Sequence, residues 1–149
     1  MRKEEKVGIK VCAALILLSF VLAPVCQETL LAGPADEKAA LESAGAWLGL
    51  VDSTEYDKSW DQAAAFFKGA VAKAQWFGSL QGVRKPLGAV ISRQIVSAKY
   101  TTNLPGAPDG HYVVIQYNTA FENKKSAVET VIPMLDKDGS WRVSGYFIK

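Results

Sequence analysis

The segment from Thr54 to Leu80 constrains the fold of this chain more than any other. Its aromatic and small apolar residues recur at steps of three and four, which places them on one stripe of a helix. The residues of this stripe are Tyr56, Trp60, Ala63, Ala64, Phe67, Val71 and Ala74. A stripe so rich in aromatic rings needs an apolar partner surface. We therefore predict one long helix from Thr54 to about Gly78 or Gly82, packed on another part of the chain.

A shorter helix is predicted immediately before this segment. Asp36 is suited to cap its start, and Asp52-Ser53-Thr54 ends the helical pattern. The apolar positions between these limits keep helical spacing, and they are Leu41, Ala44, Trp47, Leu48 and Val51. Because the connection is short, the two helices should lie antiparallel.

The period of the apolar residues changes from 3.6 to 2 after Gly88, which indicates strands. The predicted strands are Ala89 to Thr102, His111 to Phe121, Ser126 to Leu135 and Ser140 to Lys149. Turn-forming residues separate them, including Asp138-Gly139. The fold class is therefore α+β, with two N-terminal antiparallel helices packed on one face of a curled antiparallel sheet of about four strands. Residues 34–149 are expected to form this single domain.

Hairpin tips at Asn123-Lys124 and Asp138-Gly139 predict a common apolar face. That face would carry Val113, Ile115, Tyr117, Phe121, Val128, Ile132, Met134, Trp141, Val143 and Phe147. In the first strand, Val96, Ala98 and Tyr100 should point to the core. The opposite face is more polar, and Arg93, Glu129 and Arg142 are expected to meet there. This outer-face polar cluster is either a weakly paired surface group or an anion site.

Residues 1–33 have the pattern of a secretory signal peptide. Met1 to Lys10 carries four basic residues, and Val11 to Cys26 is uncharged and apolar. This apolar run is shorter than the roughly 20 residues that a membrane-spanning helix needs. We expect the protein to be exported to the periplasm, with the cleavage site left open. A lipoprotein anchored through Cys26 and an uncleaved N-terminal anchor are the alternatives.

Composition excludes several classes of function. From Gln27 onward the chain has 13 basic and 13 acidic residues, so no concentrated basic face for a nucleic acid is expected. Cys12 and Cys26 both lie in or beside the leader, which leaves no thiol chemistry for the mature domain. His111 is the single histidine, with Asp109 as its nearest acid. We therefore predict no metal, no cofactor and no catalytic residue.

Several short stretches are shared with a known family. They are Ala46-Trp47-Leu48-x-Leu50-Val51-Asp52, Ser59-Trp60, Arg84-x-Pro86-Leu87-Gly88, Leu104-Pro105-Gly106-x-Pro108-Asp109-Gly110 and Asp138-Gly139-x-Trp141-Arg142-Val143-x-Gly145-Tyr146. On these residues the chain resembles domain of unknown function 4019, a family of small exported bacterial proteins. The order of helices and strands also resembles the NTF2-like, or cystatin-like, cone fold. The resemblance implies export and a single domain, and it carries no catalytic residue.

The aromatic residues suggest the leading hypothesis for function. They either fill the core between helices and sheet or line a ligand pocket there. The candidate ligand-binding residues are Trp60, Trp76, Phe77, Tyr100 and Tyr117. We expect a non-catalytic module that binds a small apolar ligand or a protein partner, with membrane contact only through the leader or a lipidated Cys26.

Two other functions stay open from the sequence. One is a cone-fold enzyme that performs acid/base chemistry in a pocket between helix and sheet. Its first candidates would be Asp52, Asp57, Tyr100 and Tyr117. The other is a homodimer formed through the outer sheet face.

Overall fold

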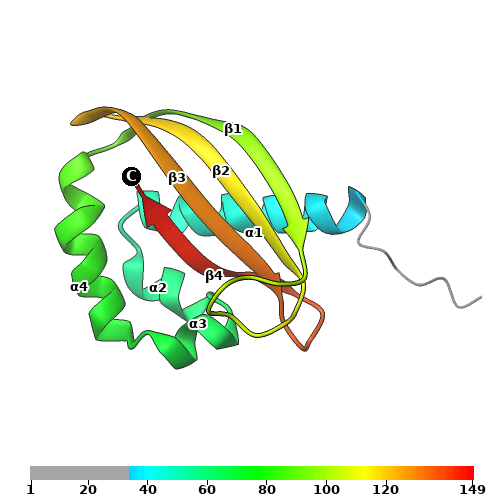
Figure 1. Ribbon diagram of the computed structural model, residues 1–149. Coiled ribbons are helices and arrows are strands. Elements are labelled where there is room, and N and C mark those ends of the chain that lie inside the picture. The colour runs from blue at the N-terminus through cyan, green and yellow to red at the C-terminus, as the bar shows by residue number, and fades with distance from the viewer. Residues whose placement is uncertain (1–33) are drawn as a thin grey trace, which may run out of the picture.

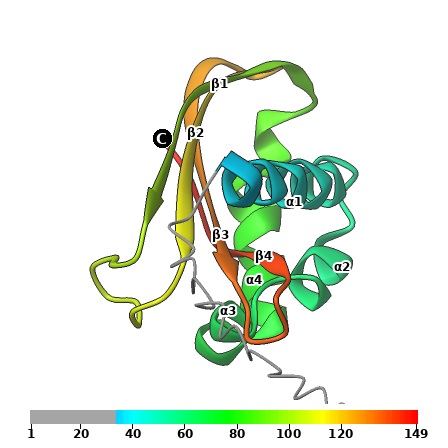
Figure 2. The same ribbon diagram turned by 90° about the vertical axis from the view of Figure 1, so that its right-hand side faces the viewer.

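The computed structural model describes residues 34–149, which form one helical layer and one sheet. The predicted signal peptide, with Cys12 and Cys26, lies outside the described residues. The elements are α1 (Pro34–Asp52), α2 (Tyr56–Asp61), α3 (Ala65–Ala70), α4 (Lys73–Val83), a 3₁₀ turn η1 (Lys85–Leu87), β1 (Val90–Thr101), β2 (Tyr112–Phe121), β3 (Lys124–Leu135) and β4 (Trp141–Ile148). The sheet stands at one side and the helices at the other (Figures 1 and 2).

Helix α1 forms as its apolar spacing predicts. Ala44, Trp47, Leu48 and Val51 are buried, and Leu41 packs against them. The helix lies behind the sheet in Figure 1 and contacts all four strands. Its buried stripe therefore supplies much of the inner wall of the core.

The prediction of one long second helix is wrong, because the segment divides into α2, α3 and α4. The breaks occur where tertiary hydrogen bonds replace helical ones. At the first break, the backbone of Ala64 is extended and its N–H donates to the carbonyl of Val143 on β4, at 2.8 Å. At the second, the indole N–H of Trp60 donates to the carbonyl of Val71, at 2.7 Å. After the first break α3 packs on β4, and after the second α4 packs on α2 and η1.

The apolar stripe of this segment still faces inward, although its helix is broken. Tyr56, Ala63, Ala64 and Phe67 are buried, and Trp60 and Val71 pack against the core from partly exposed positions. Ala74, the last member of the stripe, is exposed. Side-chain period therefore predicted which residues are buried better than it predicted the length of the helix.

The four strands form one antiparallel sheet in the order β1-β2-β3-β4, which confirms the α+β class and the predicted meander. The turn between β2 and β3 comes one residue earlier than predicted, at Glu122-Asn123, since Phe121 pairs with Lys124. Asn123 fixes the turn through bonds to the carbonyls of Pro86 and Leu87. A β-bulge between Thr119 and Phe121 follows this turn, and with it Tyr117 pairs with Glu129 rather than with Thr130.

This shift of one residue exchanges the two faces of β3, because side chains alternate along a strand. Ala127, Glu129 and Val131 are buried against the helices, whereas Val128 is 38% exposed on the outer face. In β1, the predicted core residue Val96 is 57% exposed. A register shift between Ile95 and Ser97 interrupts the alternation there.

The core consists of a large cluster between helices and sheet and a small one under the β1–β2 loop. In the large cluster Trp47, Phe67, Trp76 and Tyr146 are in ring contact, with centroids 5.1–6.3 Å apart. The small cluster centres on Tyr112 and Met134. Within residues 34–149, both clusters are built from residues between Ala40 and Tyr146.

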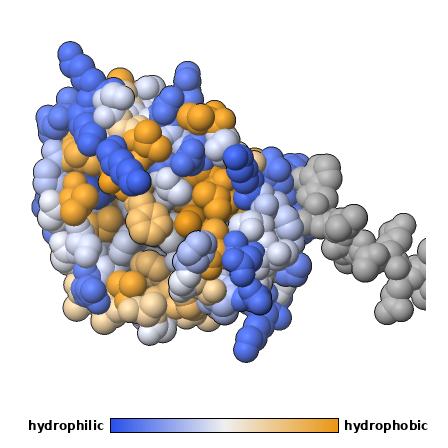
Figure 3. Space-filling model, viewed as in Figure 1, coloured by the Kyte–Doolittle hydropathy of each residue, from blue (hydrophilic) through white to orange (hydrophobic). Residues whose placement is uncertain are grey.

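Within the described residues, no helix covers the outer face of the sheet, which faces the viewer in Figures 1 and 3. Apolar side chains gather near its middle, among hydrophilic ones (Figure 3). Phe147 is the most exposed aromatic residue of β4, at 57%. Within residues 34–149, no helix combines the length and the apolar character needed to cross a bilayer.

Candidate functional site

Two places in the fold concentrate charged side chains, and they differ in their access to solvent. One is a buried ionic network between the helices and the inner face of the sheet. The other is an open cleft at the far end of the sheet. We describe the network first, because it contains most of the polar residues considered in the sequence.

Glu129 on β3 is the centre of the buried network. Its side chain is fully buried, and both of its oxygens accept two hydrogen bonds. Arg93 on β1 donates to Oε2 through Nε at 2.6 Å and to Oε1 through a terminal nitrogen at 3.2 Å. The hydroxyls of Thr119 and Tyr146 donate to Oε2 and Oε1, respectively. The carboxylate is therefore completely satisfied by protein groups.

Asp52, at the end of α1, extends this network toward the surface. It accepts hydrogen bonds from Arg93 at 2.7 and 3.1 Å and from Arg84 at 3.0 Å. The Arg84 side chain is 4% exposed, and its guanidinium lies 4.6 Å from the ring centre of Phe121. Two arginines thus balance two carboxylates, and the buried group is formally neutral.

The protonation states follow from this arrangement. Burial alone lowers the pKa of Arg93, but hydrogen bonds and charges from Asp52 and Glu129 outweigh it and hold the pKa above its ordinary value. Burial, the charge of Glu129 and the bond to it raise the pKa of Tyr146. Tyr146 is therefore a proton donor to Glu129 throughout the physiological range. Both carboxylates of the network are occupied by protein donors, whereas the buried Nε of Arg84 has no hydrogen-bond partner among the described residues.

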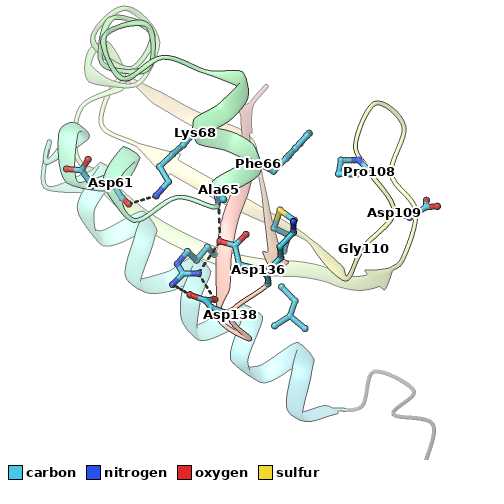
Figure 4. A pocket seen from close by; sticks show the side chains of 13 residues that line it. Asp61, Ala65, Phe66, Lys68, Pro108, Asp109, Gly110, Asp136 and Asp138 are labelled. Atoms are coloured by element: carbon cyan, nitrogen blue, oxygen red, sulfur yellow. Dashed lines mark hydrogen bonds and ion pairs between the residues drawn. The ribbon is translucent and has the colours of Figure 1, made fainter.

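The open cleft lies between α3, the β1–β2 loop and the β3–β4 turn. It has a volume of about 850 Å³. Phe66 on α3 and Pro108 on the loop stand on opposite sides of it, and Asp136 lies below Ala65, to which it is hydrogen-bonded (Figure 4). Met134 and Leu135 add apolar surface. The cleft therefore presents carbon-rich surface to solvent with charged groups at its rim.

The charged groups of the rim are largely paired with one another. Arg142 on β4 contacts Asp136 at 3.0 Å and Asp138 at 2.8 Å. Asp136 also accepts a hydrogen bond from the backbone N–H of Ala65 at the start of α3, at 3.3 Å. The bonds from Arg142 hold the pKa of Asp138 well below its ordinary value. Asp138 is thus ionised, and both aspartates of the β3–β4 turn are held by Arg142.

The predicted ligand-binding residues do not meet in one pocket. Trp76 and Tyr117 are buried in the core, where the indole N–H of Trp76 donates to the Ser59 hydroxyl at 2.9 Å. Trp60 is partly buried against Val71, and Phe77 is 37% exposed beside Tyr56. Tyr100 contacts His111 near the end of β1. None of these five lines the cleft beside α3.

The predicted outer-face cluster requires a correction. Arg93 and Glu129 do meet, but they do so on the inner face. The bulge between Ile95 and Ser97 reverses the alternation for Arg93, and the shifted pairing of β3 does so for Glu129. Arg142 is not part of this group and pairs with Asp136 and Asp138. The three residues therefore belong to two separate clusters.

The residues considered for acid/base chemistry are also separated. Asp52 belongs to the buried network near Tyr117, whereas Asp57 is exposed on α2. His111 contacts Tyr100, and Asp109 accepts instead from the side-chain amide of Asn103, at 3.0 Å. Among the described residues, no group of three or more histidine, cysteine or acidic side chains is placed to hold a metal ion.

Sequence reasoning missed Tyr146, Thr119 and Arg84 as partners of the network, and Phe66 as a wall of the cleft. One signal was present for Glu129. It stands in a row of alternating positions whose other members, Ala127, Val131 and Pro133, are apolar. An acid in such a row is typical of a buried, paired group. No comparable local signal marks the cleft, because its walls come from three distant segments.

Comparison with known proteins identifies the family and nothing closer. No curated protein and no solved structure matches the chain. The likeness to the cone fold therefore stays a prediction. The family model described as "Protein of unknown function (DUF4019)" matches residues 43–146, which is more than two thirds of the chain and spans both the network and the cleft. The chain belongs to the DUF4019 family.

Proposed function

We propose that this protein is an exported, non-catalytic binding module that holds a small apolar or amphipathic ligand in the cleft beside α3. The cleft is the observation that supports this proposal most directly. Its volume of about 850 Å³ is within the range of small-molecule sites. Its walls include Phe66, Pro108, Met134 and Leu135, which suit an apolar group.

The position of the charged groups supports a binding role over catalysis. Arg142, Asp136 and Asp138 are already paired with one another at the rim. The carboxylate with the most unusual surroundings, Glu129, is fully buried and has no route to a ligand in the cleft. Hydrogen-bonding groups at the rim would orient a ligand, while the apolar wall would supply most of the affinity.

The proposal that the protein is exported depends on its N-terminal segment. Residues 1–33 combine a basic start with an apolar run, which is typical of a signal peptide. The periplasm is the expected compartment. The apolar cluster between helices and sheet is a means of stabilising a binding module there without a disulfide.

Two phenylalanines provide a matched test of the cleft. Phe66 and Phe77 are both 37% exposed on neighbouring helices, but only Phe66 lines the cleft. We expect residues 34–149 to bind the dye 1-anilinonaphthalene-8-sulfonate, and Phe66→Ser to weaken binding about tenfold through loss of apolar contact. Phe77→Ser should change it less than about twofold. Fluorescence titration measures both affinities.

Two results would count against the cleft as the site. One is equal weakening by both substitutions, which would indicate dye uptake on exposed helix surface in general. The other is an absence of dye binding by the unaltered domain. Chemical-shift changes at the Met134 methyl group on addition of dye would locate the bound molecule independently of the substitutions.

A further inference from the structure

The distribution of charge along the chain is uneven, although the mature domain is neutral as a whole. From Gln62 to Pro108 there is no acidic residue, whereas Lys68, Lys73, Arg84, Lys85, Arg93 and Lys99 are basic. Arg84 and Arg93 are neutralised in the buried network, and Lys73 pairs with Asp61. Lys68 donates to the carbonyl of Asp61, and Lys85 and Lys99 are exposed and take part in no ion pair among residues 34–149.

The fold brings Lys85 next to the other basic pair of the sequence, Lys124-Lys125. The β2–β3 turn is fastened to η1 by hydrogen bonds from Asn123 to the carbonyls of Pro86 and Leu87, at 2.9 and 3.0 Å. In Figure 1 these segments lie side by side at the upper left, beside the end of α4. Lys124 and Lys125 also have no ion-pair partner in the described part of the chain. Three lysines therefore gather at one end of the molecule.

One acidic residue lies within this group. Glu122 accepts a hydrogen bond from the backbone N–H of Ala89, at 2.7 Å, which holds its carboxylate against the start of β1. With three lysines and one glutamate, the end of the molecule carries a net charge of +2.

Exposed aliphatic side chains accompany these lysines. Val83, at the end of α4, is 58% exposed, and Ile91, at the start of β1, is 67% exposed. Of the eight large apolar residues that are exposed within residues 34–149, six lie in the acid-free stretch. We call Val83, Lys85, Ile91, Lys124 and Lys125 the basic end. Its hydrophilic side chains project at the upper left of Figure 3 with apolar ones between them.

We propose that the basic end docks on the surface of a bilayer that contains anionic lipids. Lysine ammonium groups match lipid phosphates, and exposed aliphatic side chains match the boundary between headgroups and acyl chains. A nucleic acid fits less well, because the basic end offers aliphatic carbons where bases would need aromatic rings for stacking. This surface lies away from the cleft, so a docked domain would leave the cleft open. The folded domain itself, in addition to the leader, would then contact the membrane.

Vesicle binding tests the proposal. The protein used is residues 34–149, which contain both core clusters. It is mixed either with vesicles of phosphatidylglycerol and phosphatidylcholine or with vesicles of phosphatidylcholine alone. Bound protein is measured after the vesicles are sedimented. We expect binding to the anionic vesicles only, and its loss at 0.5 M salt. The triple substitution Lys85→Gln/Lys124→Gln/Lys125→Gln should lower the partition coefficient about a hundredfold, since each lysine near an anionic surface contributes about fivefold.

Matched variants distinguish binding through the basic end from binding that depends only on net charge or on exposed apolar surface in general. The triple substitution Lys38→Gln/Lys58→Gln/Lys137→Gln removes the same charge elsewhere and should have a much smaller effect. Ile91→Ser should weaken binding about fivefold. Phe147→Ser, which alters a residue that is 57% exposed on the outer face, should weaken it less than about twofold.

Several outcomes would overturn the proposal. Equal losses in the two triple variants would mean that binding follows net charge. Equal binding to anionic vesicles and to vesicles of phosphatidylcholine alone would show that anionic lipid has no role. Failure of the unaltered domain to bind anionic vesicles at low salt, or tighter binding to a DNA duplex than to vesicles, would contradict it directly. Circular dichroism of each variant verifies that it is folded before it is compared.

Discussion

Arg93 and Arg142 each join two carboxylates, yet the two arginines have very different surroundings. The partners of Arg93 are Asp52 and Glu129, which lie 41 and 36 residues away in the sequence. The partners of Arg142 are Asp136 and Asp138, only six and four residues away. The side chain of Glu129 is fully buried, whereas that of Asp138 is 57% exposed.

This difference separates two roles for the same pair of chemical groups. A buried ion pair loses its hydration on folding, so its partners must all be in place before it contributes to stability. The Arg93 group therefore ties the end of α1 to two strands and depends on the whole fold. The Arg142 group remains hydrated and joins residues of one hairpin. We expect substitutions in the first group to affect stability far more than those in the second.

Glu129→Gln should give the largest effect. The substitution leaves Arg84 and Arg93 buried beside a single carboxylate, Asp52. Breaking a buried pair in this way costs about 3–5 kcal/mol, because an uncompensated charge stays in the interior. Unfolding in urea, followed by tryptophan fluorescence, measures the loss of free energy of unfolding.

A double variant protects this prediction from simple failure to fold. Glu129→Leu/Arg93→Leu removes both charges of the central pair, and it should be more stable than Glu129→Gln. If Glu129→Gln lowered the free energy of unfolding by less than about 1 kcal/mol, the network would not stabilise the fold as its geometry indicates.

Tyr146→Phe should have an intermediate effect, because it removes one hydrogen bond to the buried carboxylate. Bonds to charged groups contribute about 1.5–3 kcal/mol. The pKa of Tyr146 is raised above its value in the unfolded chain, near 10. Its contribution is therefore complete below about pH 10 and is lost as the pH rises through the folded-state pKa.

The comparison to make is the alkaline slope of stability. Above pH 10, the stability of Tyr146→Phe should fall less steeply than that of the unaltered domain, as measured by urea unfolding at several pH values. Tyr100→Phe serves as a control, since Tyr100 contacts the exposed His111 instead of the network. An unchanged slope in Tyr146→Phe would rule out a special role for this hydroxyl.

The same distinction explains how much could be predicted from the sequence. The stripe of α1 depends on neighbouring residues and was predicted from local pattern. A turn does form at Gly139, which has a positive φ, but the predicted pairing beside it is off by one residue, since Trp141 pairs with Leu135 and not with Asp136. The break at Ala64 depends on Val143, and the β2–β3 turn depends on bonds between Asn123 and Pro86. Such distant contacts leave no periodic signal. The turn and the bulge between Thr119 and Phe121 together move the pairing of β3 by a single residue, which was enough to place Glu129 on the wrong face in the prediction.

The cleft was beyond sequence reasoning for a related reason. Its walls come from α3, the β1–β2 loop and the β3–β4 turn, which meet only in the folded chain. Phe66 and Phe67 are adjacent aromatic residues, and the helical stripe predicted that Phe67 is buried. It did not show that the neighbouring Phe66 would face a hollow.

Asp138→Asn should give the smallest effect, and its pH dependence sharpens the comparison. Hydrogen bonds from Arg142 lower the pKa of Asp138 in the folded state. The carboxylate therefore stabilises the fold above its unfolded pKa of about 4, and this contribution is lost as the pH falls toward the folded-state pKa. The thermal midpoints of Asp138→Asn and the unaltered domain should differ slightly at pH 6 and converge in acid. High salt should also reduce the difference, because the pair is exposed.

Asp57→Asn, at an exposed aspartate of α2, is the matched control. If Asp138→Asn instead destabilised the domain as much as Glu129→Gln, the Arg142 group would stabilise the fold as strongly as the Arg93 group does. The distinction between the two arginines would then not hold.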